Sequence, residues 1–419
     1  MITKIFMPSK GTTLKKTYMW TAAAGIIYAG SSFVMSLVIT NLLGAAAAGV
    51  FTNAMAIAAL LGTIGLYNVR MFQVSDVSEQ YTFADYSVMR ILTTVVMIVA
   101  GIIWLLIVGY SGEKLIVVIA LIVFKLGEAI SDLFEGRYQQ MARYDVSCRG
   151  VVYKTLLYLI VFVGCLFITK NLVLSASLLA VVYLISIVII DSQLLPKFKL
   201  TPLRVNIGTQ GKLIAECTPL FINAFLITYI LNASKYTMEQ YHGDAYLGIF
   251  NALYMMAFVI NLFAAFALKP LITILSDKYL SGDKKGFVKM IRRQSLIIVG
   301  LTVVAIIGAW FLGTMVLTFI FGIDLSSYQG ELCLMLVGGA FTALYQLFQY
   351  GIIIMRHQIM CLIGSVITAV LTFFFTPVLT RVYGIMGATI SFVISMALMS
   401  LILFVLNWYF LRKESVTDE

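Results

Sequence analysis

Long apolar stretches separated by short polar segments make up nearly the whole of this chain. A helix needs about 20 apolar residues to cross the hydrocarbon core of a membrane, and it pairs its own backbone polar groups there. Stretches of that length occur at residues 17–42, 46–67, 88–110, 115–134, 151–169, 172–191, 212–232, 246–268, 294–321, 331–354, 359–380 and 385–411. The pattern therefore predicts an all-α integral membrane protein with about 12 transmembrane helices.

The overall composition supports a membrane protein and excludes a soluble domain of this size. Of the 419 residues, 61% are hydrophobic and only 11% are charged, and the mean hydropathy is +0.99. The five cysteines show no metal-ligand spacing, so we interpret them as packing thiols. We find no nucleophile elbow, phosphate-binding glycine loop or zinc signature, and neither His242 nor His357 has a catalytic partner in the sequence. The chain is therefore not expected to be an enzyme, and no cofactor is expected.

Basic residues gather on one side of the predicted spans, which fixes the orientation because cytoplasmic loops retain Lys and Arg. The segments on that side carry Lys4, Lys10, Lys15, Lys16, Arg137, Arg143, Arg149, Lys154, Lys197, Lys199, Arg204, Lys212, Lys269, Lys278, Lys284, Lys285, Lys289, Arg292 and Arg293. The opposite side carries only Lys114, Lys170, Lys235 and Arg381. Both termini are therefore expected in the cytoplasm. No cleavable signal is expected, and the net charge of +10 reflects this topology signal, not nucleic-acid binding.

A short repeat suggests that the chain consists of two halves. Gly49-Val50-Phe51 begins the second span, and Gly248-Ile249-Phe250 begins the eighth. Together with the number of spans, this predicts two pseudo-symmetric six-helix bundles, 1–191 and 212–419, joined by a cytoplasmic linker at 192–211. Chance similarity between two apolar strings is the alternative. Two halves with the substrate path between them are a recurring plan of transporters.

Three charged residues interrupt the fourth span. Lys125, Glu128 and Asp132 share one helix face, because residues three and seven positions apart lie close together around a helix. Each charge at the centre of a membrane helix costs about 2.5–3.5 kcal/mol on insertion scales, so this face must contact protein or water. The three residues either form the polar wall of a cavity, or Lys125 and Glu128 neutralise each other locally while Asp132 lies at the interface.

Four stretches carry a family resemblance, and they follow one another in order and spacing over most of the chain. Residues 67–90 (YNVRMFQVSDVSEQYTFADYSVMR) and 124–145 (FKLGEAISDLFEGRYQQMARYD) resemble the loop after the second helix and the fourth helix of bacterial polysaccharide flippases of the Wzx type. Residues 216–236 (ECTPLFINAFLITYILNASKY) and 248–271 (GIFNALYMMAFVINLFAAFALKPL) are similar to the seventh and eighth helices of that family. The superfamily comprises multidrug, oligosaccharidyl-lipid and polysaccharide exporters.

The resemblance implies a flippase in the bacterial cytoplasmic membrane. Its cargo would be an undecaprenyl-diphosphate-linked oligosaccharide that passes from the cytoplasmic to the outer leaflet for capsule, O-antigen or exopolysaccharide synthesis. Two bundles would alternate access to a cationic cavity. Expected partners are membrane lipids and the glycan polymerase and glycosyltransferases of the same pathway, with no nucleic acid.

A diphosphate cargo requires positive charge in a polar cavity, while its hydrocarbon tail can remain in lipid. Arg suits bidentate phosphate contacts and Lys acts as a point charge. The candidate substrate-binding residues are Arg70, Lys125, Lys235 and Arg381, with interfacial anchoring as the alternative for each.

Glu128 and Asp132 are the candidates for binding a coupling ion, a proton or sodium. The membrane potential alone could also drive export of an anion, at about 2.3 kcal/mol per charge per 100 mV. Two other functions remain open from the sequence, a small-molecule or multidrug exporter of the same superfamily and a scaffold of a glycan-assembly complex that transports nothing.

Overall fold

The computed structural model describes residue 6 and residues 14–76, 78–198 and 206–417. Within these helices, the side chains of 14–15, 262–270, 272–273 and 414–417 are not described. The described chain is helical almost throughout and divides into two compact units. The first unit comprises residues 1–43 and 50–225, and the second comprises residues 44–49 and 226–419. The predicted bundle boundaries at 191 and 212 remain a prediction; helix α8 contributes residues to both units.

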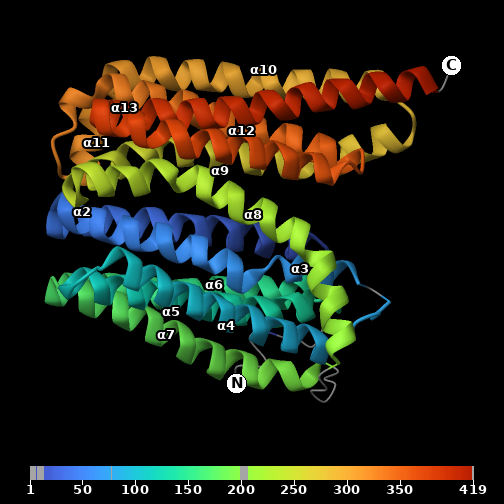
Figure 1. Ribbon diagram of the computed structural model, residues 1–419, viewed down its shortest axis with the longest axis horizontal. Helices are drawn as coiled ribbons and strands as arrows, with labels where there is room; N and C mark the ends of the chain where they lie inside the picture. Colours follow the sequence, from blue (N-terminus) through green and yellow to red (C-terminus); the bar gives the residue numbers. More distant parts are fainter. Residues whose placement is uncertain (1–5, 7–13, 77, 199–205, 418–419) are drawn as a thin grey trace. The chain divides into compact units, whose positions relative to one another are not determined.

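The first unit is a bundle of long helices (Figure 1). Its helices are α2 (Leu14–Leu66, apart from 44–49), α3 (Val69–Ser75), α4 (Phe83–Val108), α5 (Gly112–Gln140), α6 (Tyr144–Thr169), α7 (Leu172–Leu194), the short η1 (Leu195–Lys197) and the first part of α8 (Ile207–His242). Phe124 of α5 is buried, edge-on to Tyr158 of α6 and Tyr183 of α7 at 5.2 and 5.0 Å between ring centroids. These contacts pack α5 against α6 and α7.

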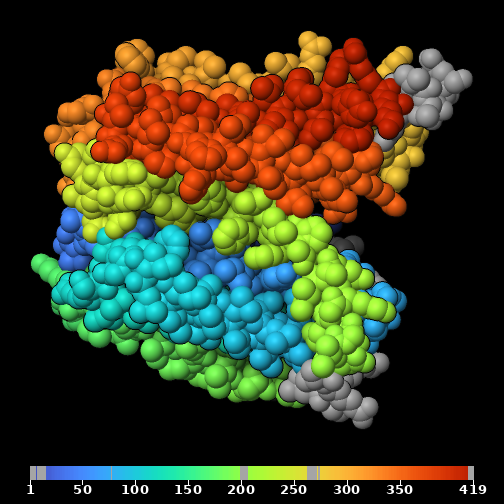
Figure 2. All heavy atoms as spheres, in the orientation of Figure 1, coloured from blue at the N-terminus to red at the C-terminus, as the bar shows by residue number. Residues whose placement is uncertain are grey.

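The second unit is also built of long helices, with α10 along one edge in Figure 1. It contains the rest of α8, α9 (Asp244–Leu280), α10 (Lys284–Gly308), the π-helical turn η2 (Ala309–Gly313), α11 (Thr314–Phe321), η3 (Ser326–Tyr328), α12 (Gln329–Ile354) and α13 (Gln358–Thr417). In the space-filling view, α13 covers much of the visible face of this unit (Figure 2). Hydroxyl pairs join its helical segments: Ser234 of α8 lies 2.8 Å from Ser391 of α13, and Thr372 lies 2.9 Å from Ser395 across the kink of α13 at Gly384. Such pairs are typical of helix contacts in membranes.

The fold-class prediction is confirmed, since the described residues are all-α and each of the twelve apolar stretches lies in helical structure to within two residues at its end. By length and composition, nine helical segments in the described part of the chain could cross a membrane. Two of them each contain a pair of expected spans, because α2 continues through a kink at Gly44 and α13 through a kink at Gly384. Helix α5 is not among the nine because its charged residues interrupt the apolar run.

The repeated glycines lie against each other's helices within the second unit. A Cβ atom on Gly49 would overlap the backbone carbonyl of Asp244, and one on Gly248 would overlap that of Ala45. Asp244 lies one helical turn before Gly248, and Ala45 lies one turn before Gly49, so the contact is reciprocal. Glycine at both positions allows the two backbones to approach this closely.

Candidate functional site

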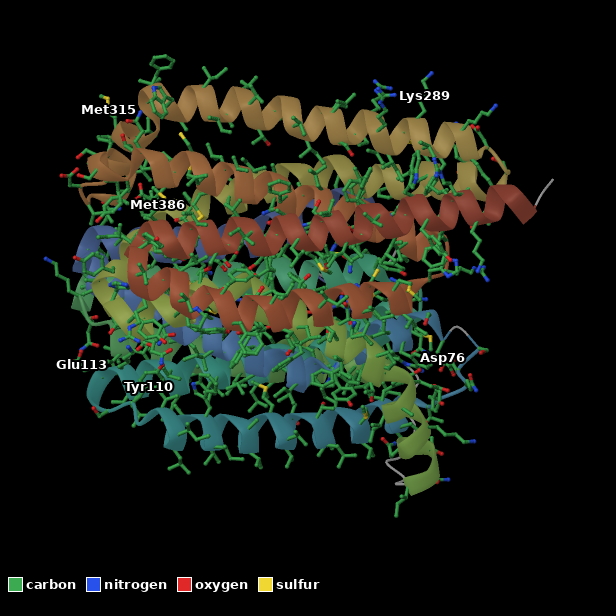
Figure 3. The ribbon with its side chains drawn as sticks, turned by 45° about the horizontal axis from the view of Figure 1, so that its top comes forward. Asp76, Tyr110, Glu113, Lys289, Met315 and Met386 are labelled. Carbon is green, nitrogen blue, oxygen red and sulfur yellow. The ribbon has the colours of Figure 1, made fainter. Side chains whose placement is uncertain are left out.

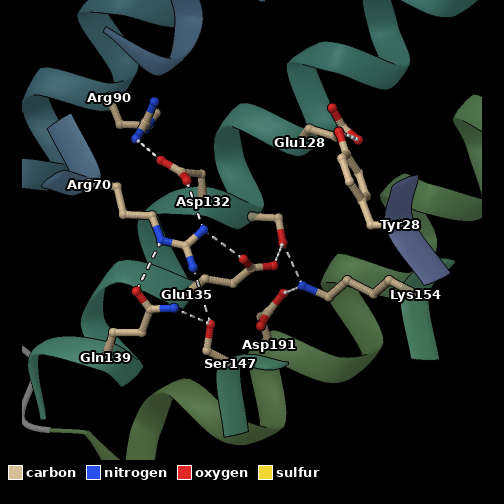
Figure 4. Close-up of polar contacts among 11 residues, drawn as sticks. Tyr28, Arg70, Arg90, Glu128, Asp132, Glu135, Gln139, Ser147, Lys154 and Asp191 are labelled. Carbon is tan, nitrogen blue, oxygen red and sulfur yellow. Dashed lines mark hydrogen bonds and ion pairs between the residues drawn. The ribbon is translucent and has the colours of Figure 1, made fainter. Parts of the chain in front are cut away.

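The charged face of α5 is the centre of a polar network inside the first unit (Figure 4). Lys125 donates to Glu128 at 2.5 Å, which is the local pair expected as one of two interpretations. Glu128 and Asp132 also line a cavity of about 270 Å³, as the other interpretation expected. The structure therefore contains the Lys125–Glu128 pair of one interpretation and, at Glu128 and Asp132, the cavity wall of the other.

Asp132 bridges two arginines from different helices. Its Oδ1 lies 3.0 Å from Arg70 of α3, and its Oδ2 lies 2.7 Å from Arg90 of α4. Arg90 is only 2% exposed and also donates to the carbonyl of Gly65 at 2.5 Å. Asp132 is thus enclosed between two cations.

Arg70 connects Asp132 to Glu135. One guanidinium nitrogen lies 2.9 Å from Glu135, and the others donate to Gln139 at 3.3 Å and to Ser147 at 3.3 Å. The guanidinium group of Arg70 therefore donates to acceptors on both α5 and α6. Arg70 was predicted as a substrate ligand, and the structure places it at the cavity wall with two carboxylates as partners.

A second buried chain of contacts extends from Glu135 to α7. Ser131 donates to Glu135 at 3.2 Å and accepts from Lys154 at 2.6 Å. Lys154 then lies 2.7 Å from Asp191, which accepts from Tyr138 at 2.9 Å. Lys154 was assigned to a cytoplasmic loop from the sequence, and that assignment is wrong. The residue is 1% exposed within α6, because the helix begins at Tyr144 and turns this side chain inward.

Tyr28 of α2 joins the network at Glu128 and Lys125. Its hydroxyl donates to Glu128 at 3.0 Å and accepts from Lys125 at 3.4 Å. Figure 4 shows its ring beside Glu128. The carboxylate of Glu128 is therefore held by a cation and a phenol, and its remaining surface faces the cavity.

The network balances its charges. Its four cations are Arg70, Arg90, Lys125 and Lys154, and its four carboxylates are Glu128, Asp132, Glu135 and Asp191. Charges at membrane depth are stable only when paired or hydrated, so pairing on this scale keeps the bundle interior polar without a net charge.

Two cavities lie against this network. The smaller, of about 270 Å³, is lined by Tyr28, Leu66, Arg70, Glu128, Asp132, Glu135, Val151, Thr155 and Tyr183. The larger, of about 440 Å³, is lined by Leu66, Asn68, Arg70, Met71, Val74, Ser75, Asp132 and Gln139. Both cavities include Leu66, Arg70 and Asp132, so these residues form the wall between them. A carboxylate or guanidinium freed from its partner would face one of the two cavities.

Lys235 has a different environment in the second unit. Its ammonium lies 4.1 Å from the ring centroid of Tyr254, whose ring packs edge-on against Phe392 at 5.2 Å. No ion pair joins Lys235 to a carboxylate among the residues that the structure describes. A cation over an aromatic face is stabilised, but its charge is not neutralised.

Arg381, the other candidate of the second unit, is exposed on α13. No ion pair of Arg381 occurs within the described ranges either. Of the predicted residues, the structure brings together Arg70 with Asp132 and Lys125 with Glu128. The roles of all six in binding or coupling remain predictions.

Sequence reasoning missed Arg90, Glu135, Lys154 and Asp191. A signal for two of them was present, since Lys154 and Asp191 are single charges in or beside apolar runs. Arg90 and Glu135 lie near the predicted ends of their spans, where charged residues are common and carry little information.

The loop between α3 and α4 belongs to a stretch that carried the family resemblance. Asp76 organises it by accepting from the amides of Gln80 at 2.8 Å and Tyr81 at 2.9 Å and from the hydroxyl of Tyr86 at 2.9 Å. Tyr81 in turn donates to Glu216 of α8 at 2.9 Å. These contacts tie the loop to the bundle and give this polar stretch a structural role.

Comparisons with known proteins inform the fold. No protein-family model matches the chain, and no curated protein matches its sequence. Among solved structures, a multidrug resistance MATE family transporter of the MOP superfamily in an inward-facing conformation is similar, with a TM-score of 0.66 and 13% identity over 100% of this chain and 99% of that chain. An outward-facing structure with the same family description has a TM-score of 0.62 and 12% identity over 99% and 98% of the two chains.

A third similar structure is a MOP superfamily transporter from Pyrococcus furiosus, described by a reverse polarity of its binding pocket that suggests a different function. Its TM-score is 0.63 at 13% identity, over 96% of this chain and 99% of that chain. Identities this low establish the fold and not the cargo. The chain therefore has the fold of the MATE transporters of the MOP superfamily.

Proposed function

We propose that this protein is an alternating-access exporter that moves a polyprenyl-diphosphate-linked oligosaccharide from the cytoplasmic to the outer leaflet of the bacterial plasma membrane. The similarity to inward-facing and outward-facing transporters of the same fold supports alternating access. The family resemblance of the four sequence stretches supports the choice of cargo. Both termini lie in the cytoplasm in this proposal, and the product feeds glycan polymerases and glycosyltransferases of the same pathway.

The observation that carries the choice of an anionic cargo is the environment of Lys235. Lys235 follows the predicted span 212–232 and is partly buried, and a partly buried charge requires a partner. Lys235 lies over Tyr254 with no carboxylate partner in the described part of the chain. A diphosphate would supply the missing negative charge, with Arg381 as a second contact near the outer side.

Arg70 and Lys125 act differently in this proposal because carboxylates already neutralise them. Protonation of Glu128 or Asp132 would release part of their positive charge toward the cavities that Arg70 lines. Sodium binding or the membrane potential would be the driving force if proton gradients have no effect.

A cationic small molecule is the second candidate cargo, and a specific observation favours it. The cavity of about 270 Å³ is lined by Glu128, Asp132 and Glu135 and by the rings of Tyr28 and Tyr183. Carboxylates with aromatic rings suit an organic cation. This cargo would compete with the cations of the network for the same carboxylates.

The two cargoes can be separated in proteoliposomes. We expect the protein to move a fluorescent polyprenyl-diphosphate oligosaccharide from the leaflet on its cytoplasmic side to the opposite leaflet, measured by the fraction accessible to an added glycosidase or quencher. We expect no accumulation of a fluorescent organic cation in the same vesicles under a proton or sodium gradient. Transport of the cation without movement of the lipid-linked saccharide would replace the proposal by the second candidate, and transport of neither would favour a scaffold.

A further inference from the structure

An apolar groove lies on the second unit, and none of the charged-network residues line it. It has a volume of about 600 Å³ and follows α10, η2 and α11 from Gln294 to Ile320, closed on its other sides by α9 and α12. It opens to the outer surface of the unit, since Leu301 and Leu312 in its lining are 62% and 59% exposed. In a membrane, the groove therefore faces lipid.

Small residues and a π-helical turn create this groove. The lining includes Ala305, Gly308, Ala309 and Gly313, which span the end of α10 and the turn η2. A Cβ atom on Gly308 would meet no heavy atom within 4 Å, so the space above this glycine is empty. π-helical turns inside helices occur frequently at functional sites.

Basic residues lie beyond the groove at the start of α10, the end of this helix that is expected on the cytoplasmic side. Residues four apart form a row along a helix, and one such row on α10 leads from the basic start of the helix into the groove. The row consists of Lys289, Arg293, Ile297, Leu301, Ala305 and Ala309. Lys289 and Arg293 are exposed and form no ion pair with the carboxylates that the structure describes. Figure 3 shows Lys289 near one end of the segment formed by α10 and α11 and Met315 near the other end.

The length of the groove limits its occupant. From Gln294 to Ile320 the helices extend about 40 Å at 1.5 Å per residue, whereas the hydrocarbon core is about 30 Å thick and one leaflet supplies half of that. An acyl chain of a phospholipid is confined to one leaflet. A polyprenyl chain is longer and can follow the whole groove.

We infer that this groove on α10 and α11 holds the polyprenyl chain of an anionic lipid, with Arg293 and Lys289 beside its phosphate. The inference rests on the proposed function, since it makes the groove the docking site of the cargo's tail. The chain lies along Ile297, Leu301 and Gly308 and continues past the π-helical turn. The glycan-bearing end then remains at the cytoplasmic face, next to the basic start of α10.

The test uses the full-length protein in nanodiscs of a zwitterionic phospholipid with photoactivatable undecaprenyl phosphate as the probe. Crosslinked peptides are identified by mass spectrometry. We expect labelling within 294–320, and competition by unlabelled undecaprenyl phosphate but not by farnesyl phosphate or phosphatidylglycerol at the same concentration. Equal competition by phosphatidylglycerol, or labelling confined to other helices, would overturn the inference.

Two glycines of α10 provide a matched pair of variants. Gly308→Phe fills the groove, while Gly300→Phe adds the same side chain to the same helix at a position that also has open space but does not line the groove. We expect Gly308→Phe to reduce labelling at least about tenfold and Gly300→Phe to change it less than about twofold. Equal labelling of the two variants, at equal thermal stability, would refute the groove as the site.

A charge variant tests the phosphate end, and a transport assay separates this inference from the proposed function. Arg293→Gln should weaken labelling about tenfold, the effect of one lost charged contact, and Arg293→Lys should restore most of it. If the wild-type groove is labelled as expected but no lipid-linked saccharide changes leaflet, the docking site stands and the proposed function fails. If saccharide transport occurs while the groove is never labelled, the proposed function stands and the groove is not the tail site.

Discussion

Lys154 and Asp191 form an ion pair of 2.7 Å that is enclosed in the first unit, on helices α6 and α7. Their side chains are 1% and 3% exposed, Lys154 also donates to Ser131, and Asp191 also accepts from Tyr138. A buried pair of this kind gives little net stability compared with apolar residues, but losing one partner leaves an uncompensated charge. Variants of this pair can therefore test whether its charges are needed for stability or for transport.

We expect Lys154→Met to lower the free energy of unfolding by about 3–5 kcal/mol, because Asp191 keeps its charge without its cation. The double variant Lys154→Met/Asp191→Leu should recover most of that loss. Unfolding in mixed micelles, followed by circular dichroism, measures both. Full transport by the double variant would identify the pair as structural, and a stable but inactive double variant would assign it a role in transport.

Asp132→Asn should be among the most damaging substitutions of one charge in the network. It removes the shared counter-ion of Arg70 and Arg90, and a broken buried pair costs about 3–5 kcal/mol. The matched control is Asp283→Asn, whose carboxylate pairs with Lys278 at 2.7 Å while both side chains are exposed, at 46% and 37%, so the loss should be much smaller. Thermal unfolding in detergent compares the two, and equal losses would contradict the importance assigned to Asp132.

Gly49→Ala and Gly248→Ala should each destabilise the described conformation by about 1–3 kcal/mol, since the added methyl group overlaps a backbone carbonyl that cannot move alone. Gly30→Ala on the same helix as Gly49 is the control, because its Cβ has open space within 4 Å. Hydrogen exchange of the amides near the start of α9 reports the effect. Unchanged exchange in both alanine variants, relative to Gly30→Ala, would show that the close approach is not retained in the membrane.

Lys235→Ala should weaken binding of the lipid-linked saccharide about tenfold or more, as expected for the loss of one charged contact of about 1.5–3 kcal/mol. Lys235→Arg keeps the charge and should retain most of the binding. Lys114→Ala removes a cation that also lies over a tyrosine ring, 5.0 Å from that of Tyr110, and should have no effect. Fluorescence anisotropy with the labelled cargo measures all three, and equal affinities of wild type and Lys235→Ala would remove this residue from the site.

The start of α10 should show a pH dependence set by Asp283, which lies outside the membrane spans. The side chain of Lys278 and the amide of Gly286 donate to this carboxylate and hold the pKa of Asp283 below its ordinary value of 3.8. Folding favours the charged carboxylate, so the stability that Asp283 gives to the start of α10 is complete above pH 3.8. This stability is lost as the pH falls through the lower pKa that Asp283 has in the folded protein. Hydrogen exchange in the first turn of α10 should therefore accelerate only below pH 3.8. The variant Asp283→Asn should lack this transition, and a wild-type midpoint above pH 3.8 would contradict the assignment.

The sequence alone determined the helices and the charged face of α5. Apolar length is a local property, so each span could be located without knowledge of its neighbours. The helical period placed Lys125, Glu128 and Asp132 on one face for the same reason.

Only the tertiary structure decided which charges meet and where space remains. Arg90 and Glu135 gave no distinctive signal, because the partners that neutralise them, Asp132 and Arg70, come from helices distant in the sequence. The groove beside Gly308 also depends on α9 and α12, which close it from other parts of the chain. Pairing and cavities arise from packing between helices, and packing is set by three-dimensional neighbours that a one-dimensional pattern does not specify.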